Sequence, residues 1–255
     1  MIFESHAHYD DEAFDQDRET LLTHMQENGI GYVVNISANL ETCRKVLKLI
    51  EQYPYIYGTL GVHPNDVLEL NEEGMEWLER KSSLDKIVAI GEIGLDYHYD
   101  EPSKEIQRKW FIRQLDLARK VQLPIIIHSR EAAQDTLDIM KAEKAGDIGG
   151  VVHCFSYGIE MAREYLSMGF YIGVGGVITF KNAKKLREVV EYAPLDRILL
   201  ETDCPYLAPE PYRGKRNSSL NLPYVVEEIA RIKNISREEV EAVTLENAKK
   251  MYRIQ

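Results

Sequence analysis

Short apolar runs alternate with helical stretches along the whole sequence, and this alternation limits the fold more than any other feature. Several runs consist of uninterrupted Val, Ile and Leu, as in parallel strands that are buried on both faces. The predicted strands are 2–6, 32–37, 56–62, 87–92, 124–128, 150–154, 170–174 and 197–202. Strands that alternate with helices in a chain of 255 residues predict an α/β fold, a (β/α)8 TIM-type barrel that forms a single domain over residues 1–255.

An open, doubly wound sheet is the main alternative architecture. It is disfavoured because no glycine-rich phosphate loop follows the first predicted strand, where a Rossmann unit needs one. The clearest helix is predicted over 103–122, where apolar residues recur at helical spacing. Helices over 223–233 and 236–251 complete the barrel, and Ser236 and Glu239 have the spacing of a capping box.

Composition and charge exclude several classes of protein. The net charge of −11 argues against a broad nucleic-acid-binding surface, because non-specific binding depends on Lys and Arg at phosphates. It leaves room for an enzyme that handles one phosphate at a time. No apolar segment approaches membrane-spanning length and no signal peptide is recognised, so we expect a cytoplasmic protein that does not act at membranes.

The three cysteines, Cys43, Cys154 and Cys204, show no CxxC spacing and are odd in number, which indicates reduced thiols. Cys154 and Cys204 each follow a candidate ligand directly. Because adjacent side chains on a strand point to opposite faces, we expect both thiols to point away from the ligands, as small core side chains.

Six potential metal ligands stand at the ends of apolar runs. They are His6, His8, Glu92, His128, His153 and Asp203. Any one of them alone could be a buried polar residue or a helix cap. As a set they indicate a site, because a parallel barrel brings the carboxyl ends of its strands to one mouth, where barrel enzymes place their chemistry. His6 and His8 are two residues apart on a strand, so both project from the same face.

This donor set indicates two divalent ions. Four imidazoles and two carboxylates suit Zn, Mn, Fe or Co, whereas Mg prefers a site richer in oxygen. Six ligands are too many for one tetrahedral ion but suit two ions that share a carboxylate and a metal-bound water. We predict Glu92 as the shared carboxylate, because its strand lies between the two histidine pairs, and Asp203 as the general base. Glu201, two residues before Asp203, is expected on the same face as a ligand or a structural partner.

Three further residues are candidates for binding the substrate. His63 ends the third predicted strand, and the alternative is a turn histidine before Pro64. Arg130 lies on the ligand face and could hold a phosphate through two hydrogen bonds; the alternative is an ion pair with Glu92 or Glu201. Arg216 stands in the long 204–222 loop and could steer a nucleic-acid backbone, unless it is only a solvated charge. Weaker candidates for substrate contact are His98, Lys215, Tyr97, Tyr99, Tyr206 and Tyr212.

The segments SHAH, GVHP, GEIGLDY, PIIIHSR, HCF, ETDCPYLAP and RGKRN resemble those of the TatD-type metal-dependent deoxyribonucleases, which are amidohydrolase-like barrels. The resemblance runs from Phe3 to the last helices, and PIIIHSR followed by LLETDCP is its most specific part. It implies a first metal at His6, His8, Glu92 and Asp203, and a second at Glu92, His128 and His153. It also implies metal-assisted hydrolysis of DNA from an end.

The chain departs from the family pattern in two places. The family usually has Asp two residues before the first histidine, where this chain has Glu4 on the same face as His6 and His8. The carboxylate is kept but reaches one methylene further, so we expect a change in the fine geometry of the metal site. The family often follows RGKRN with a short acidic-Pro segment; here SSLNLP stands instead, so the entry loop is expected to contact the substrate differently.

We therefore predict a two-metal phosphodiesterase that acts on DNA ends, in the manner of a 3′-to-5′ exonuclease, with no obligate protein partner. The alternative enzyme is a binuclear amidohydrolase that cleaves a small cyclic amide, ester or phosphoester. That class often bridges its metals with a carbamylated Lys, and no Lys ends a predicted strand here. A scaffold protein with structural metals is disfavoured, because structural sites tend to be closed and four-coordinate.

Overall fold

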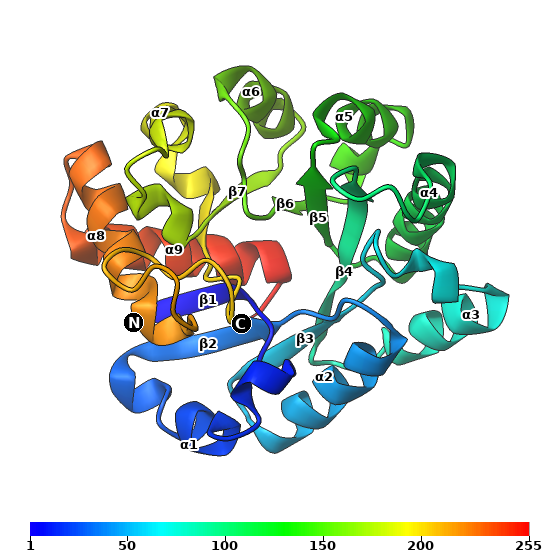
Figure 1. Ribbon diagram of the computed structural model, residues 1–255, viewed down its shortest axis with the longest axis horizontal. Helices are drawn as coiled ribbons and strands as arrows, with labels where there is room; N and C mark the ends of the chain where they lie inside the picture. The colour runs from blue at the N-terminus through cyan, green and yellow to red at the C-terminus, as the bar shows by residue number, and fades with distance from the viewer. Residues whose placement is uncertain (255) are drawn as a thin grey trace.

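In the computed structural model, which describes residues 1–254, eight parallel strands follow one another around a barrel and helices surround them (Figure 1). The strands are β1 Ile2–Ala7, β2 Ile30–Asn35, β3 Ile56–Leu60, β4 Ile87–Asp96, β5 Ile125–Arg130, β6 Gly150–Val152, β7 Tyr171–Val174 and β8 Ile198–Leu200. Each strand pairs in parallel with the next. The predicted (β/α)8 barrel is confirmed, and the open sheet is excluded because the strand order never reverses.

Several strands begin or end away from their predicted limits. β2 starts and ends earlier than the predicted 32–37, whereas β4 continues beyond the predicted end at 92 as far as Asp96. β6 and β8 stop at Val152 and Leu200, so His153 and Asp203 lie in the loops that follow these strands. Both loops begin with a sharp turn, in which Cys154 and Asp203 adopt positive φ values of 43° and 55°.

Helices cover the outside of the barrel. They are α1 Arg18–Thr23, α2 Leu40–Gln52, α3 Glu72–Lys81, α4 Lys104–Val121, α5 Ala133–Ala142, α6 Ile159–Ser167, α7 Lys184–Tyr192, α8 Leu222–Lys233 and α9 Arg237–Tyr252. The helices predicted over 103–122, 223–233 and 236–251 correspond closely to α4, α8 and α9. Ser236 caps α9 by accepting a hydrogen bond from the Glu239 amide at 3.1 Å, as the spacing of these residues predicts.

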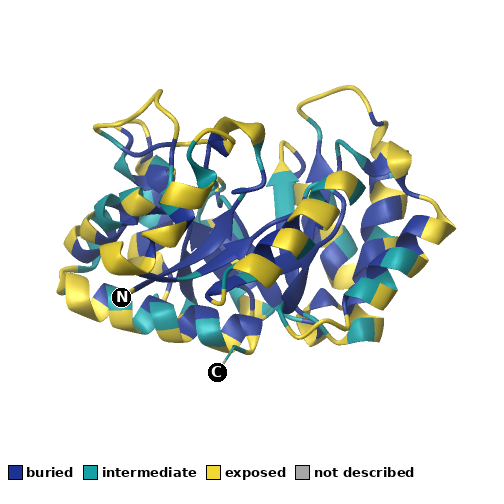
Figure 2. Ribbon diagram, turned by 90° about the horizontal axis from the view of Figure 1, so that it is seen from below, coloured by how far each residue is buried: buried dark blue, intermediate teal, exposed yellow. Residues whose placement is uncertain are grey.

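The apolar core has two layers, one between strands and helices and one inside the barrel. Neighbouring strand residues divide between them, because successive side chains point to opposite faces. Val33 and Ile127 pack in the outer layer with the helices, whereas Val34 and Ile126 belong to the inner cluster, which also contains Met251 of α9. Figure 2 shows the strands buried at the centre and the exposed faces of the helices around them.

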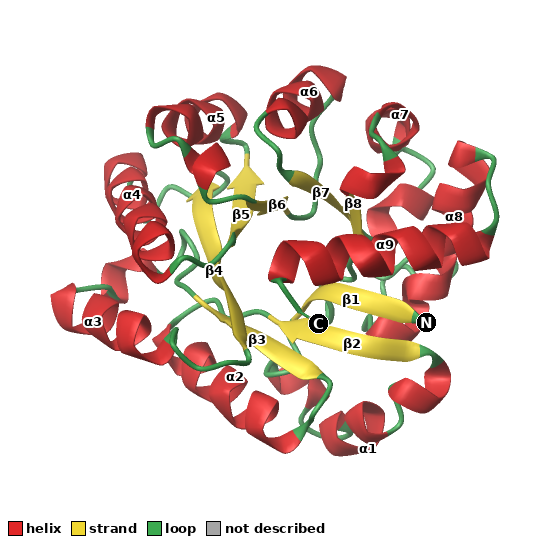
Figure 3. Ribbon diagram, turned by 180° about the vertical axis from the view of Figure 1, so that it is seen from behind, coloured by secondary structure: helices red, strands yellow, loops and turns green. Residues whose placement is uncertain are grey.

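Side chains and α9 close the barrel between β1 and β8. The Ser5 hydroxyl donates to the Leu200 carbonyl at 2.7 Å, and Ala7 forms an isolated bridge with Cys204. Tyr252 of α9 donates to the Ser5 carbonyl at 2.7 Å. Figures 1 and 3 place α9 on one face of the barrel and the 204–222 loop on the other, so the strand ends that carry the candidate ligands open beneath this loop. Among residues 1–254, no helix is both long enough and apolar enough to cross a bilayer.

Candidate metal centre

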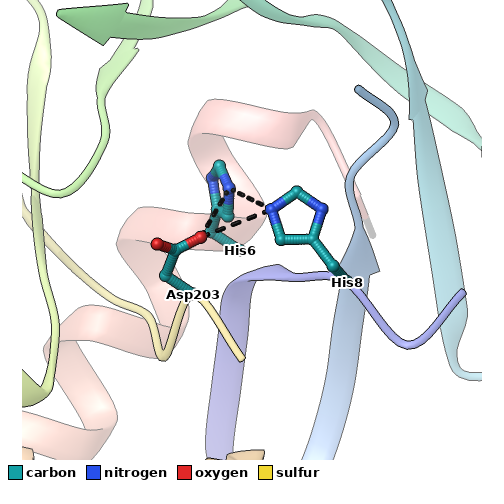
Figure 4. Close-up of side chains that lie close together, drawn as sticks. All are labelled: His6, His8 and Asp203. Carbon is teal, nitrogen blue, oxygen red and sulfur yellow. Dashed lines mark hydrogen bonds and ion pairs between the residues drawn. The ribbon is translucent and has the colours of Figure 1, made fainter. Parts of the chain in front are cut away.

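His6, His8 and Asp203 form one group at the mouth (Figure 4). The Nε2 atoms of the two histidines lie 3.2 Å apart, and Asp203 Oδ1 lies 3.5 Å from His6 Nε2 and 3.3 Å from His8 Nε2. The turn after β8 directs Asp203 toward β1, and its amide donates to the His6 carbonyl at 2.9 Å. Residues nearly two hundred positions apart in the sequence are therefore brought together, as the strand-end pattern predicts.

Glu92 lies between two sets of imidazoles. Its Oε2 is 3.5 Å from His6 Nε2 and 3.9 Å from His8 Nε2. Its Oε1 is 2.7 Å from His128 Nδ1 and 2.6 Å from His153 Nε2. The carboxylate is buried, and each of its oxygens faces a different pair of histidines. This is the arrangement that a shared carboxylate needs.

His63 lies closer to this centre than its position before a proline suggests. Its Nε2 is 3.8 Å from Glu92 Oε1, and its ring meets that of His128 edge-on with centroids 4.3 Å apart. His63, Glu92 and His128 form a second group whose ligand atoms lie within 4.8 Å of one another. His63 is thus positioned to contribute to the centre itself.

Asp96 lies at this centre and is not among the residues that the sequence pattern singled out. Its Oδ2 lies 3.2 Å from His128 Nε2 and accepts a hydrogen bond from the Asn65 side chain at 3.3 Å. The predicted strand ended at Glu92 and therefore did not include Asp96. The available signal was the alternation Glu92–Gly94–Asp96, which a longer strand places on one face.

Glu201 forms a third group with His6 and His153, deeper in the barrel. These two rings stack with centroids 4.0 Å apart. One buried atom of each residue lacks a hydrogen-bond partner in the described structure: His6 Nδ1, His153 Nδ1 and Glu201 Oε2. Gly173 on β7 provides the space for this carboxylate, because a side chain at that position would overlap Glu201 Oε2.

The donor atoms fit divalent cations. His6 and His8 face each other through ring nitrogens 3.2 Å apart, and so do His128 Nδ1 and His153 Nε2. Two facing imidazole nitrogens repel unless a proton or a cation lies between them. Nitrogen and carboxylate donors together match the preferences of zinc and neighbouring transition metals. The three unpartnered buried atoms around Glu201 give further reason to expect an ion or an ordered solvent molecule here.

The surroundings shift the pKa values of three carboxyl groups in different directions. Burial raises the pKa of Glu92, but the charge of His153 and hydrogen bonds from the histidines outweigh it and hold the pKa well below its usual range. Burial likewise raises the pKa of Asp203, and the hydrogen bond with His8 more than reverses this effect. Burial dominates at Glu201 and raises its pKa to about 8.

The pKa values of the histidines shift in two directions. Burial, reinforced by neighbouring imidazoles, lowers the pKa of His6 to about 4 and that of His63 to about 3. For His8 and His128, burial acts in the same direction, but hydrogen bonds to Asp203 and to Asp96 and Glu92 raise both pKa values to about 9. A cation entering the site therefore has to displace protons.

The model of the TatD-related DNase family matches residues 3–253. The chain belongs to this family. An uncharacterized metal-dependent hydrolase of Bacillus subtilis, YabD, is 44% identical over 254 residues, covering 100% of both chains. The crystal structure of the TatD homologue YjjV from Escherichia coli has a TM-score of 0.93 at 31% identity, over 100% of this chain and 98% of that one. A TatD family hydrolase from Entamoeba histolytica has a TM-score of 0.89 at 27% identity, over 98% of this chain and 97% of that one.

As a TatD family member, the protein is a metal-dependent hydrolase with several groups of candidate metal ligands at its mouth. All six ligands predicted from the sequence lie in these groups or in contact with them. Among the substrate-contact candidates, Arg130 is exposed and its guanidinium lies 5.7 Å from the centre of the Tyr99 ring. Glu92 faces His128 and His153, and Glu201 accepts a hydrogen bond from the Cys154 amide. Neither of the ion pairs considered for Arg130, with Glu92 or with Glu201, is therefore formed.

Arg216 lies farther out and is already paired. Its guanidinium forms two hydrogen bonds to Asp17, at 2.7 and 2.6 Å, and lies over the Phe14 ring. These contacts attach the 204–222 loop to the segment after β1. His98 is exposed and contacts Glu131 at 2.7 Å.

The expectation for Cys154 is wrong. Because β6 ends at Val152, strand alternation does not extend to residue 154, and the turn gives Cys154 a positive φ. Cys154 is partly exposed and lines the same small cavity as Glu201 and Asp203, so it is not a core residue. Cys204 is buried, as predicted for a core side chain, and Cys43 is buried as well.

Proposed function

We propose that this TatD family protein hydrolyses phosphodiester bonds at DNA ends with two divalent ions that share Glu92. The observation that carries the proposal is the position of Glu92, whose two oxygens face two different pairs of histidines. His6, His8 and Asp203 would hold the first ion with Glu92. His128 and His153 would hold the second ion, with His63 close by.

Divalent ions bound here would lower the pKa of water and neutralise charge on phosphate oxygens. Asp203 would accept the proton of the attacking water. Its carboxylate is ionised at neutral pH and its side chain is 17% exposed, whereas that of Glu92 is 4% exposed. Of the two acidic ligands, Asp203 is therefore the one that solvent reaches from the mouth.

The charge distribution supports a substrate that is held locally. The chain carries a net charge of −11, so long-range attraction to a nucleic-acid backbone is weak. Two divalent ions would make the mouth positive, and the exposed Arg130 adds a cation that can bind a phosphate at its rim. A phosphodiester at a DNA end can be held by contacts at the mouth alone, whereas binding along a duplex needs a longer positive surface. The charge distribution therefore favours cleavage from an end.

The test is metal content followed by cleavage of labelled DNA. Protein loaded with Zn²⁺ or Mn²⁺ should contain two ions per chain and should shorten single-stranded or duplex DNA stepwise. Labels at the 5′ or the 3′ end distinguish the polarity, and 3′-to-5′ action keeps a 5′ label on ever shorter products. Asp203→Asn should lower the rate by about a hundredfold or more, whereas Asp147→Asn, at an exposed Asp, should leave it unchanged.

Two outcomes would contradict the proposal. A single ion per chain under saturating metal would remove the role of Glu92 as a shared ligand. Turnover of cyclic amides, lactones or phosphotriesters without any cleavage of DNA would favour the amidohydrolase alternative.

A further inference from the structure

The first strand and the far end of the 204–222 loop are joined by two buried polar residues. Glu4 stands in β1 and Ser219 in the SSLNLP segment, 215 positions later. The Ser219 hydroxyl donates to Glu4 Oε2 at 2.8 Å, and both residues are buried. A carboxylate and a hydroxyl that are far apart in the sequence thus meet in the fold.

Glu4 faces this loop and not the metal ligands. Its Oε1 accepts hydrogen bonds from the amides of His6 and Thr202, both at 3.0 Å. Its Oε2 accepts from the hydroxyls of Thr202 at 2.6 Å and Ser219 at 2.8 Å. Four hydrogen-bond donors therefore converge on the two oxygens of the Glu4 carboxylate. No candidate metal group among residues 1–254 includes Glu4.

The hydroxyl of Ser219 is oriented by Tyr9. The Ser219 amide donates to the Tyr9 hydroxyl oxygen at 2.9 Å, and the two hydroxyl groups lie 2.7 Å apart. Because the Ser219 proton is directed to Glu4, the Tyr9 hydroxyl donates to Ser219 Oγ. Each hydroxyl then donates once, and the chain of hydrogen bonds ends on the carboxylate.

Glu4 also fixes the backbone around two candidate ligands. Thr202, which it binds through amide and hydroxyl, directly precedes Asp203. The His6 amide donates to Glu4, and the His6 carbonyl accepts from the Asp203 amide at 2.9 Å. One carboxylate therefore joins β1, the turn that carries Asp203 and the far end of the 204–222 loop.

We propose that Glu4 and Ser219 are coupled positioning residues that fasten the 204–222 loop to β1 and set the backbone of Asp203. The extra methylene of Glu allows one carboxylate to reach both Thr202 and Ser219. This proposal rests on the proposed function only through the role of Asp203. The effect of Glu4 and Ser219 on the loop does not depend on the reaction.

A double-mutant cycle tests the coupling. The variants are Glu4→Asp, Ser219→Ala and the two combined, with Ser218→Ala as the matched control, because Ser218 is adjacent and its hydroxyl is not part of this network. The first readout is the rate of trypsin cleavage after Arg213 and Lys215, which lie in the loop. Losing a hydrogen bond to a buried carboxylate should raise this rate about tenfold in either single variant.

The combined variant should be cleaved little faster than the single ones, because each substitution removes the same contact. The second readout is the dissociation constant for Zn²⁺, which should rise several-fold in parallel. Thermal unfolding of each variant confirms that it folds, and Ser219→Ala keeps the test available if the shorter carboxylate is not tolerated.

Multiplicative effects in the combined variant, or cleavage rates equal to that of Ser218→Ala, would overturn the pairing. Unchanged Zn²⁺ affinity with coupled loop cleavage would overturn its effect on Asp203. These results can be distinguished from a failure of the proposed function. Coupled loop cleavage in a protein without activity on DNA would contradict only the proposed function.

Discussion

At the scale of single residues, the pKa values of the buried carboxylates in the site depend more on the partners of each carboxylate than on its burial. Glu92 and Glu201 are both buried, yet the pKa of Glu92 is held well below its usual range and that of Glu201 is raised to about 8. The difference follows from contacts, because His128 and His153 lie within 2.7 Å of Glu92, whereas one oxygen of Glu201 has no hydrogen-bond partner among residues 1–254. Glu92 thus contributes a negative charge at the centre, as Asp203 does.

Replacing Glu92 by Gln keeps the size of the side chain and removes its charge. We expect metal content to fall and hydrolysis to drop by about a hundredfold or more, because a shared ligand and its charge are lost together. Metal analysis and initial rates measure both effects. Glu51→Gln, at an exposed position on α2, is the control and should match the unsubstituted protein.

Asp96 offers a second test at this scale. Its contact with His128 Nε2 at 3.2 Å orients an imidazole that also faces Glu92. Asp96→Asn should reduce metal affinity or turnover by about 10–100-fold, the usual cost of losing a carboxylate behind a histidine ligand. Calorimetric titration with Zn²⁺ measures the affinity. An unchanged affinity and rate would show that His128 does not need this partner.

At the scale of elements, strand ends and the turns after them direct the ligands. β1 presents His6 at its end, and the turn after β8 directs Asp203 back toward it. β7 contributes no ligand and instead makes room, because Gly173 leaves space for Glu201. A strand that contributes no candidate ligand therefore shapes the centre.

Gly173→Ala tests this role of β7. The added methyl group would overlap the Glu201 carboxylate, so we expect a loss of about 1–3 kcal/mol in the free energy of unfolding. Zn²⁺ affinity should fall as Glu201 moves. Gly74→Ala in α3 is the matched control: its methyl group meets only ordinary contacts, and Ala should stabilise the helix by about 0.5–1 kcal/mol. Equal stability of both variants would contradict the packing argument.

At the scale of the whole molecule, the barrel and its chemistry are separable. Two apolar layers and the α9 closure hold the fold, and the candidate ligands lie at its mouth. Metals are therefore expected to serve the reaction and to add stability, without being required for folding.

Chelation tests this separation. Removing metal with EDTA should abolish hydrolysis while the far-ultraviolet circular dichroism and cooperative unfolding persist. Restoring free Zn²⁺ to a hundredfold above its dissociation constant should raise the unfolding free energy by about 2.7 kcal/mol per site. Loss of cooperative unfolding in EDTA would show instead that the metals hold the fold together.

The sequence alone determined the barrel and the residues at its mouth, because apolar runs and the residues that end them are local patterns. It missed Asp96, because the predicted strand ended at Glu92 whereas β4 continues past a glycine with a φ of 144°. It was wrong at Cys154, which lies in a turn after a strand shorter than predicted.

Only the tertiary structure decided which oxygen of Glu92 faces which histidines, that Glu201 lies against Gly173, and that Glu4 meets Ser219. Each of these contacts joins elements that are far apart in the sequence. Their geometry depends on how the barrel closes, on strand register and on a few turns, and no local sequence pattern encodes these.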